Sequence, residues 1–433
     1  MRMYDILEKK ADGGTLNKEE MEYFVRKLCA DELPDYQAAA LIMAIYTRGM
    51  SDTEAAQFTD VMAKSGDQVD LSGIRGIKVD KHSTGGIGDK TTLILGPLAA
   101  ACGGTVAKMS GRGLGFTGGT IDKLESIPGF RTALSEEEFV RLVNENGFAL
   151  TGQTANVAPA DKKIYAMRDV TATVSSVPLI ASSIMSKKLA SGADKFLLDV
   201  KVGSGALMKT AEEAKRLARL MTAIGRENGR ETEAVLTNMD RPLGKAVGNL
   251  LEVQEAVEVL KGEGPADLRE LCLYLVSRML VLGGLGTEED CRKRAEKALA
   301  DGSALAVFER FVICQGGDLD VIYRPEKAYR TPVCREIRAE KSGWFTVVSA
   351  EDIGKASVRL GAGRLAKEDA IDYTAGIYFR ADVEEPVEKG EVLCRIYGAD
   401  ESRFDEAEMI LSRALRVTEE EPEKKPLIEF IKL

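Results

Sequence analysis

The chain has 433 residues, of which 44% are hydrophobic and 30% are charged, so it can build two or three domains with cores of their own. Its 69 acidic and 59 basic residues give a net charge of −10, which argues against a generic nucleic-acid or membrane-surface binder. The seven cysteines contain no Cys-x-x-Cys pair and no apolar signal segment begins the chain, so we expect reduced thiols and a cytoplasmic protein.

Residues 1–66 carry helical patterns throughout. Asn17 with Glu20, and Ser51 with Glu54, have the spacing of capping boxes at helix starts. Each pair precedes apolar residues at helical spacing. We therefore expect a small all-helical domain at this end of the chain.

Residues 67–335 alternate strand-like and helical patterns, apart from a mainly helical interruption at 160–192. Such alternation is typical of an α/β domain with a mixed, largely parallel sheet and a ligand site at the C-terminal ends of its strands. We expect this large domain to comprise 67–159 and 193–335. The strand-like runs are 77–79, 105–109, 195–200 and 232–237, and helical patterns include 91–102, 135–146, 210–227 and 267–282.

Beyond residue 345 the pattern becomes β-rich. Strand-like segments occur at 344–348, 377–381 and 392–397, and a charged stretch at 419–425 precedes a last apolar run from Leu427 to Ile431. We expect a separate α+β C-terminal domain at 345–433, and we assign no chemistry to it.

Three glycine-rich turns lie within forty residues, at 81–92, 108–113 and 117–120. Glycine allows main-chain N–H groups to approach an anion closely, and a strand, a turn and a helix start place the positive end of the helix dipole there. The spacing fits neither a nucleoside-triphosphate loop nor the dinucleotide fingerprint. The turns therefore indicate a phosphate site, although each turn alone is also compatible with an ordinary tight turn.

His82 is the only histidine of the chain, and it lies between Lys81 and Ser83 in the first glycine turn. We expect it in an exposed loop with no apolar face to fill. A histidine pKa of roughly 6.5 suits proton exchange near neutrality. The position favours a catalytic or substrate-contacting role over a structural one.

Three long motifs, at 81–89, 110–125 and 168–174, closely resemble the signatures of the thymidine and pyrimidine-nucleoside phosphorylases. The resemblance covers essentially the whole chain. It implies that 160–192 joins the N-terminal helices in one domain, which faces the α/β domain across a cleft and closes about hinges such as Gly66 and Gly192. It also implies a homodimer, for which apolar helix 38–46 offers a surface.

The resemblance implies a site with two sides. Ser183 and Lys187 are four residues apart and therefore lie on one face of one helix. Residues 187 and 188 alone also fit a solvated helix end. The implied catalytic residues are His82, Arg168 and Lys187, and the implied substrate-binding residues are His82, Tyr165, Arg168, Ser183 and Lys187. The implied phosphate-binding residues are Lys81, Ser83, Thr92, Lys108, Met109, Ser110 and Thr120.

The implied reaction is reversible phosphorolysis, in which phosphate attacks C1′ of a pyrimidine nucleoside with inversion and releases the base and α-D-(deoxy)ribose-1-phosphate. The family's broad-specificity members resemble this chain in having a lysine at Lys108. A cation there tolerates the polar ribose 2′-OH, so we expect activity on uridine, deoxyuridine and thymidine. The alternative is an enzyme restricted to 2′-deoxynucleosides.

Residues 241–255 read as a tight loop entering a helix, and an ordinary helix start explains them. The resemblance implies a structural potassium ion between this loop and the first glycine turn. Its ligands would be hard oxygens, with only the main chain of Lys90 involved. They are the Glu255 carboxylate and the carbonyls of Gly88, Lys90, Leu243 and Ala246.

Two other functional classes fit part of the pattern. A phosphoribosyltransferase shares a glycine-rich phosphate site but has to bind pyrophosphate and a metal, and the base pocket at 168–187 speaks against it. A non-catalytic nucleoside sensor would not need His82 beside a complete phosphate cradle.

Overall fold

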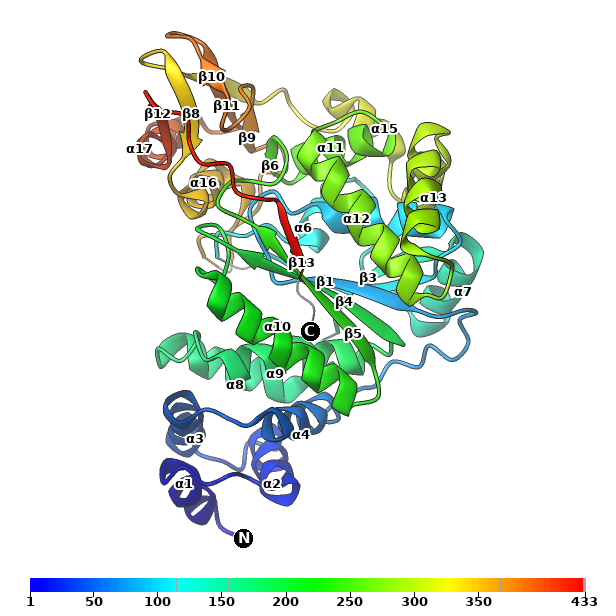
Figure 1. The fold of residues 1–433 in the computed structure, drawn as a ribbon, viewed down its shortest axis with the longest axis vertical. Helices are drawn as coiled ribbons and strands as arrows, with labels where there is room; N and C mark the ends of the chain where they lie inside the picture. The colour runs from blue at the N-terminus through cyan, green and yellow to red at the C-terminus, as the bar shows by residue number, and fades with distance from the viewer. Residues whose placement is uncertain (114, 155, 367, 431–433) are drawn as a thin grey trace.

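The computed structural model describes residues 1–113, 115–154, 156–366 and 368–430. Leu114 of the second glycine-rich motif and Ile431 of the last expected strand lie outside the described residues. Figure 1 shows the N-terminal helices at one end of the molecule, the main sheet in the middle and the C-terminal β-rich part at the other end. The fold class expected from the sequence is confirmed. The expected C-terminal domain at 345–433 was wrong in one respect, because the strand at 428–430 pairs with the main sheet.

Four N-terminal helices form the first part, and both expected capping boxes are present. The Asn17 side chain accepts from the Glu20 N–H at 2.9 Å, and the Asn17 N–H donates to the Glu20 carboxylate at 2.8 Å. Such caps satisfy N–H groups that the first helical turn leaves free. The helices are α1 (Met3–Ala11), α2 (Lys18–Cys29), α3 (Asp35–Arg48) and α4 (Asp52–Ala63).

The helical interruption packs onto these helices, between them and the main sheet (Figure 1). It contains α8 (Pro159–Val170) and α9 (Val177–Ala190). One face of α9 contacts α4, and another contacts α10 (Ala211–Glu227) of the α/β domain. Because α9 is apolar on several sides, it is buried between the two domains.

The main sheet is mixed and largely parallel. Strands β1, β4 and β5 pair in parallel, and β13 adds an antiparallel edge. Strands β2 and β3 form a parallel pair that is joined to β1 through the bridge between Lys78 and Thr105. The strands are β1 (Val79–Ser83), β2 (Val106–Ser110), β3 (Phe148–Gly152), β4 (Lys195–Val202), β5 (Glu231–Asn238) and β13 (Ile428–Phe430).

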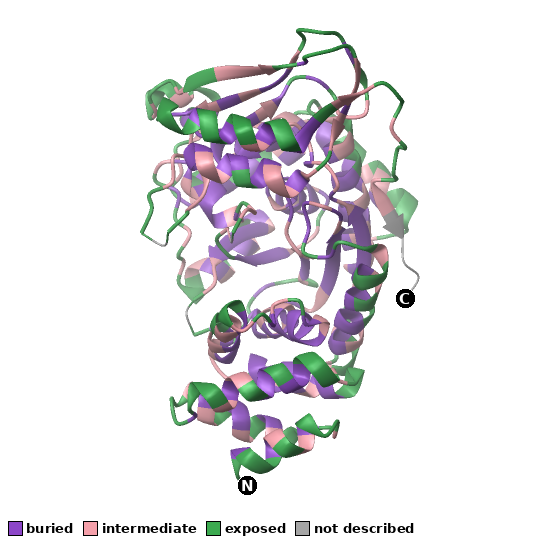
Figure 2. Cartoon of the chain, turned by 90° about the vertical axis from the view of Figure 1, so that its left-hand side faces the viewer, coloured by how far each residue is buried: buried purple, intermediate pink, exposed green. Residues whose placement is uncertain are grey.

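Helices cover the sheet, and the buried residues concentrate in the sheet and on the helix faces toward it (Figure 2). The helix α5 starts directly after the first glycine turn, as expected. These helices are α5 (Thr91–Ala101), α6 (Thr120–Glu125), α7 (Glu136–Asn146), α11 (Leu250–Leu260), α12 (Ala266–Leu282), α13 (Glu288–Ala300), α14 (Ser303–Cys314) and α15 (Leu319–Tyr323).

The C-terminal part contains two small antiparallel sheets, in the orders β6-β9-β11-β7 and β10-β8-β12. Strand β6 (Ala246–Gly248) belongs to the loop before α11, so this loop carries the edge of a C-terminal sheet. The other elements are β7 (Val333–Arg338), β8 (Gly343–Val347), α16 (Ala350–Ser357), β9 (Gly376–Phe379), β10 (Pro386–Val387), β11 (Val392–Gly398), α17 (Phe404–Ala414) and β12 (Leu415–Thr418).

Across the described ranges, we find no helix with the length and apolarity that a membrane span requires.

Candidate active site

The candidate site lies at the C-terminal ends of β1 and β2, where the glycine turns begin. Parallel pairing of β1 with β4 places Ser83 beside Asp199, so side chains far apart in sequence meet at one edge of the sheet. Strand β2 ends at Ser110, whose side chain is buried. Polar and charged side chains thus converge at this edge of the sheet.

His82 does not lie in an exposed loop, and that expectation was wrong. Strand β1 continues through it to Ser83, and the imidazole is half-buried at the strand end. Burial and the nearby ammonium groups of Lys188 and Lys108 lower the pKa of His82 well below its ordinary value. Without a ligand, the imidazole is therefore neutral at pH 7 and can both donate and accept a hydrogen bond.

Asp80, two residues before His82, forms ion pairs with two buried lysines. Lys108 Nζ lies 2.8 Å from Asp80 Oδ1, and Lys188 Nζ lies 2.8 Å from Asp80 Oδ2. Although burial alone would raise it, the two ammonium groups lower the pKa of Asp80 to about 2. Burial lowers the pKa of Lys108 to about 8. This buried cluster has one more positive than negative charge, which suits an anionic ligand.

Lys81 belongs to a second buried network. Its ammonium lies 2.8 Å from Asp199 Oδ2 and donates to Thr91 Oγ1 at 2.7 Å. Lys201 Nζ also lies 2.8 Å from Asp199 Oδ2. Asp89 Oδ2 lies 4.0 Å from Lys201 Nζ, so the two ammonium groups and the two carboxylates of this network balance in charge. Against the effect of burial, Lys201 and Lys81 lower the pKa of the buried Asp199.

Asp89 organises the first glycine turn. Its carboxylate accepts from Ser83 Oγ at 2.5 Å and from Thr91 Oγ1 at 2.6 Å. Ser83 Oγ in turn accepts from the Gly85 N–H at 3.1 Å. The hydroxyl expected to bind phosphate is therefore held in a fixed position on the turn. Thr92 and Thr120, at the starts of α5 and α6, are each half-buried.

The residues expected to bind the base lie on α8 and α9, in two pairs whose members contact each other. Lys187 Nζ donates to Ser183 Oγ at 3.2 Å and forms an ion pair with Asp161, which confirms that the two α9 residues share a helix face. Tyr165 is half-buried, and the Arg168 guanidinium lies 5.9 Å from the centre of its ring.

Arg168 is almost fully buried and holds the connection between α8 and α9. Its Nε, Nη1 and Nη2 donate to the carbonyls of Thr173, Leu179 and Val174 at 3.3, 3.1 and 2.5 Å. A guanidinium has five N–H groups, so one on each terminal nitrogen is left for another acceptor. Arg168 thus shapes the loop as well as being a candidate for the base edge.

Sequence reasoning missed the acidic partners and two buried lysines of the site. The sequence around Lys188 also fits a solvated helix end, yet the Lys188 side chain is 2% exposed. No local pattern marks these residues, because their partners come from other strands and helices. The one available signal was adjacency to a predicted residue, as for Asp80 beside Lys81. The missed residues are Asp80, Asp161, Lys188, Asp199 and Lys201.

Three of the oxygens expected to bind potassium instead accept hydrogen bonds from the side chain of Lys90. Lys90 Nζ donates to the carbonyls of Leu243 and Ala246 at 3.0 and 2.8 Å and forms an ion pair with Glu255. We expected only the main chain of Lys90 to face this position. The Lys90 side chain occupies the position instead, because a buried ammonium needs hydrogen-bond acceptors and these oxygens supply them.

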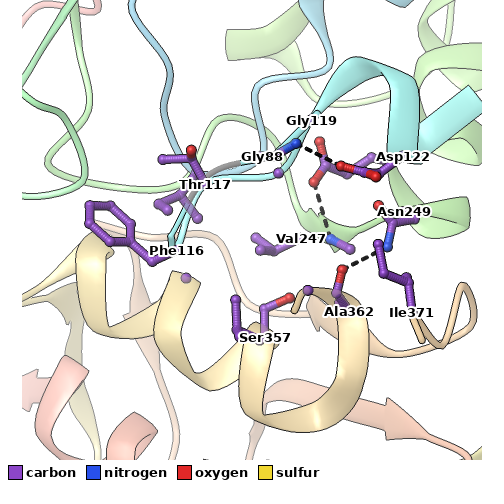
Figure 3. A pocket seen from close by; sticks show the side chains of 18 of the residues that line it. Gly88, Phe116, Thr117, Gly119, Asp122, Val247, Asn249, Ser357, Ala362 and Ile371 are labelled. Atoms are coloured by element: carbon purple, nitrogen blue, oxygen red, sulfur yellow. Dashed lines mark hydrogen bonds between the residues drawn. The ribbon is translucent and has the colours of Figure 1, made fainter. Parts of the chain in front are cut away.

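Figure 3 shows a pocket beside this position, between the second glycine-rich motif and α16. Gly88, Phe116, Asp122 and Asn249 line it, and Asn249 Nδ2 donates to the Ala362 carbonyl at 2.8 Å. The His82, Lys108 and Lys188 side chains are not among its lining residues. The pocket is therefore distinct from the strand-end clusters.

Three family models match the chain in the order of its structural parts. The glycosyl transferase family helical bundle domain matches 4–66, the glycosyl transferase family a/b domain matches 75–305, and the pyrimidine nucleoside phosphorylase C-terminal domain matches 344–418.

Relatives of similar length share about half of the residues. A pyrimidine-nucleoside phosphorylase of Geobacillus stearothermophilus is 51% identical over 96% of both chains. Another, from Staphylococcus aureus strain bovine RF122 / ET3-1, is 55% identical over 92% of both. The anthranilate phosphoribosyltransferase of Thermus thermophilus superposes with a TM-score of 0.56 at 21% identity, over 71% of this chain and 98% of that one, which bears on the fold alone. The chain belongs to the pyrimidine-nucleoside phosphorylase family, within the glycosyl transferase family that shares its helical-bundle and α/β domains.

Proposed function

We propose that the protein catalyses the reversible phosphorolysis of uridine, deoxyuridine and thymidine, giving free base and α-D-(deoxy)ribose-1-phosphate. Membership of the family supports the reaction class. The observation that carries the proposal is the placement of the only histidine beside the buried Asp80, Lys108 and Lys188 cluster. That cluster has an excess positive charge next to a group that can contact a leaving base.

Phosphate binds, in this proposal, above the glycine turns. The buried hydroxyl of Ser110 and the N-termini of α5 and α6 supply donors, and Ser83, whose O–H is directed to Asp89, joins them when that hydroxyl turns to the phosphate. Lys81 and Lys108 supply the electrostatic field from buried ion-paired positions, and the Met109 carbonyl holds Lys188 at 3.4 Å. Thr92 and Thr120 complete the cradle at the starts of their helices.

The base binds on the α8 and α9 side. Ser183 and Lys187 share one face, and Arg168 keeps N–H groups for a carbonyl oxygen, while Tyr165 lines the pocket. Pyrimidine O2 and O4 are hydrogen-bond acceptors whose negative charge grows as the glycosidic bond breaks. Cationic donors placed there bind the transition state more strongly than the ground state.

In the reaction, a phosphate oxygen forms a bond to C1′ while the bond from C1′ to N1 breaks. The electron pair of the broken bond goes to the base, whose O2 accepts a hydrogen bond from His82. The neutral imidazole keeps one N–H, so it can donate this hydrogen bond and pass its proton to the base anion, and a proton from solvent then restores it. Holding both reactants in line supplies much of the rate enhancement, and the geometry inverts C1′.

The sugar specificity depends on Lys108 in this proposal. Lys108 lies in the middle of β2, and its buried ammonium pairs with Asp80, two residues before His82. An ammonium can donate a hydrogen bond to the 2′-oxygen of ribose, whereas an apolar residue would leave that hydroxyl without a partner. Restriction to 2′-deoxynucleosides is the second candidate, and thymidine cleavage without uridine cleavage would favour it.

We also infer a homodimer that associates through the N-terminal helices. Large apolar side chains are exposed on α1 and α3, including Tyr4, Tyr36, Met43 and Tyr46, of which Tyr36 is 74% exposed. Exposed apolar residues that cluster on one face are typical of protein interfaces.

The decisive experiment is chromatographic detection of free base after incubation of the pure protein with uridine or thymidine, with and without inorganic phosphate. Phosphate-dependent release from both substrates supports the proposal. Release from uridine 5′-monophosphate, but not from uridine, with pyrophosphate and a divalent metal would favour a phosphoribosyltransferase. Nucleoside binding without any release would favour a sensor.

A further inference from the structure

Lys90 places an ammonium group inside a closed set of oxygens. Its side chain has 0% exposure, and Nζ contacts the Leu243 and Ala246 carbonyls and the Glu255 carboxylate. An ammonium has three N–H groups, so these three acceptors satisfy it completely. The other hydrogen bonds of the Glu255 carboxylate come from the N–H groups of Lys245 and Ala246, at 2.8 and 3.1 Å.

The surrounding backbone leaves little space. Gly88 has a φ of +70°, and a Cβ there would lie 2.7 Å from the Leu243 carbonyl. Gly244 has a φ of +71°, and a Cβ there would lie 2.5 Å from Glu255 Oε2. Two positions that only glycine accommodates thus let the first glycine turn and the 243–246 loop close around the ammonium.

A potassium ion does not fit these residues as they stand. It would need the carbonyls and the carboxylate that Lys90 Nζ already uses. Its charge would also lie beside that of the ammonium, with Glu255 as the one carboxylate in contact with Lys90 among the described residues. Like charges in a buried site repel strongly.

We propose that Lys90 itself supplies the cation of this site, so that the protein needs no potassium or other monovalent metal ion there. Lys90 is a positioning residue. It ties the first glycine turn, which carries Asp89 and Ser83, to the loop that continues into β6. Strand β6 pairs with β9, so the same contact also fixes the phosphate turn relative to the C-terminal sheet.

A covalently attached cation differs from a bound ion in one measurable way. Occupancy of a bound ion depends on its concentration, so stability and turnover follow the salt used. An attached ammonium is always present, and no salt can displace it. The inference goes beyond the proposed activity, and thermal unfolding tests it even if that activity is wrong.

The first test is thermal unfolding of the purified protein in potassium, sodium or choline chloride at equal ionic strength. We expect one melting temperature in all three salts. A melting temperature that rises with potassium alone, in a saturable way, would overturn the proposal. This measurement needs no variant, so it decides the question even where a variant fails to fold.

The second test is Lys90→Thr, which removes the ammonium and leaves a small hydroxyl among hard oxygens. In choline chloride we expect a melting temperature lower by about 5 °C or more, because Glu255 loses its partner. Potassium should restore much of this loss, and phosphorolysis with it. Lys90→Met, which refills the space with an apolar chain, should not respond to potassium.

Lys10→Thr is the matched control. Lys10 is also buried and ion-paired, with its Nζ 2.7 Å from Glu54 Oε1, but it lies in the N-terminal helices. Its loss should lower the melting temperature equally in every salt. If Lys90→Thr responded to potassium no more than Lys10→Thr does, the oxygens would not form a cation site, and the proposal would be wrong.

Discussion

Lys188 Nζ lies 2.8 Å from Asp80 Oδ2, and this ion pair connects α9 with β1. Lys187, the neighbour of Lys188, belongs to the face proposed to bind the base, and His82 lies two residues after Asp80. Both groups are buried, so breaking the pair would strand a charge. The pair therefore sets the position of α9, the helix proposed to contact the base, relative to the proposed phosphate site.

His82 gives a direct probe of this cluster, because it is the only histidine and contributes a single set of imidazole signals. We expect an NMR titration without phosphate to give a pKa below the ordinary value of roughly 6.5. Among the nearby charges, the Lys188 ammonium lowers this pKa most, so Lys188→Met should raise it. Phosphate, by adding negative charge, should raise it too.

Lys293→Met is the control for this titration, because Lys293 lies on the exposed face of α13 in an ion pair with Glu289. The His82 pKa should be unchanged in that variant. An ordinary His82 pKa in the unliganded wild type would show that the imidazole is not held next to the lysine cluster.

His82→Ala should lower turnover more than it weakens phosphate binding. Removing one donor that acts mainly in the transition state costs about 100-fold in kcat. Phosphate affinity, measured by calorimetry, should change by less than about threefold, since buried lysines supply the field. Unchanged turnover would remove His82 from the mechanism.

Phosphate affinity should fall as the pH rises through about 8. The pKa of Lys108 is lowered to about 8, so its ammonium loses a proton in this range, whereas the unfolded chain keeps it until roughly pH 10.4. Bound phosphate favours the charged form, so binding near pH 8 should take up protons. Calorimetry in two buffers of different ionisation enthalpy measures that uptake.

Lys108→Met is the matched variant for the pH experiment, because it removes the titrating group while keeping a long side chain. Its phosphate affinity should be weaker at pH 7 and should lack the loss near pH 8. The lowered pKa of Lys108 also affects stability. Between about pH 8 and 10 the unfolded state binds more protons at Lys108, so this residue makes the fold more stable as the pH rises.

The same Lys108→Met variant tests sugar specificity. Uridine has a 2′-OH and thymidine does not, so kcat/KM for uridine should fall about tenfold more than kcat/KM for thymidine. Parallel kinetics on both nucleosides at saturating phosphate measure the ratio. An equal loss on both substrates would assign Lys108 to phosphate alone.

The dimer proposal predicts that Tyr36→Arg yields monomers. A charge in the centre of an apolar interface is costly, whereas Tyr36 is 74% exposed within one chain and its loss should leave the fold intact. Light scattering coupled to size-exclusion chromatography gives the mass. Met409→Arg on α17, where Met409 is 51% exposed, is the control and should leave the mass unchanged.

Local patterns predicted local structure well. The capping box of Asn17 and Glu20 formed, and so did the shared face of Ser183 and Lys187, because both depend on residues within one helix. The end of β1 was harder to predict. Its last residues, including His82, are polar and lack the apolar signal of a strand, yet parallel pairing with β4 continues through them.

Burial of charged side chains could not be predicted from the sequence. Lys90 and Glu255 are 165 residues apart, and Asp80 and Lys188 are 108 apart. Lysine is rarely buried unless it is paired, so a lysine met alone in sequence is expected to be solvated. Only the tertiary fold brings each pair together.

The antiparallel edge strand β13 has a consequence for synthesis of the chain. Ile428 pairs with Thr237 and follows it by 191 residues. At roughly 5–20 residues per second, the ribosome takes about 10–40 s to add the segment that covers β5. During that time β5 presents an open edge to which a strand of another nascent chain can add. The yield of native protein in a cell should therefore depend on chaperones that shield this edge, independently of how stable the finished fold is.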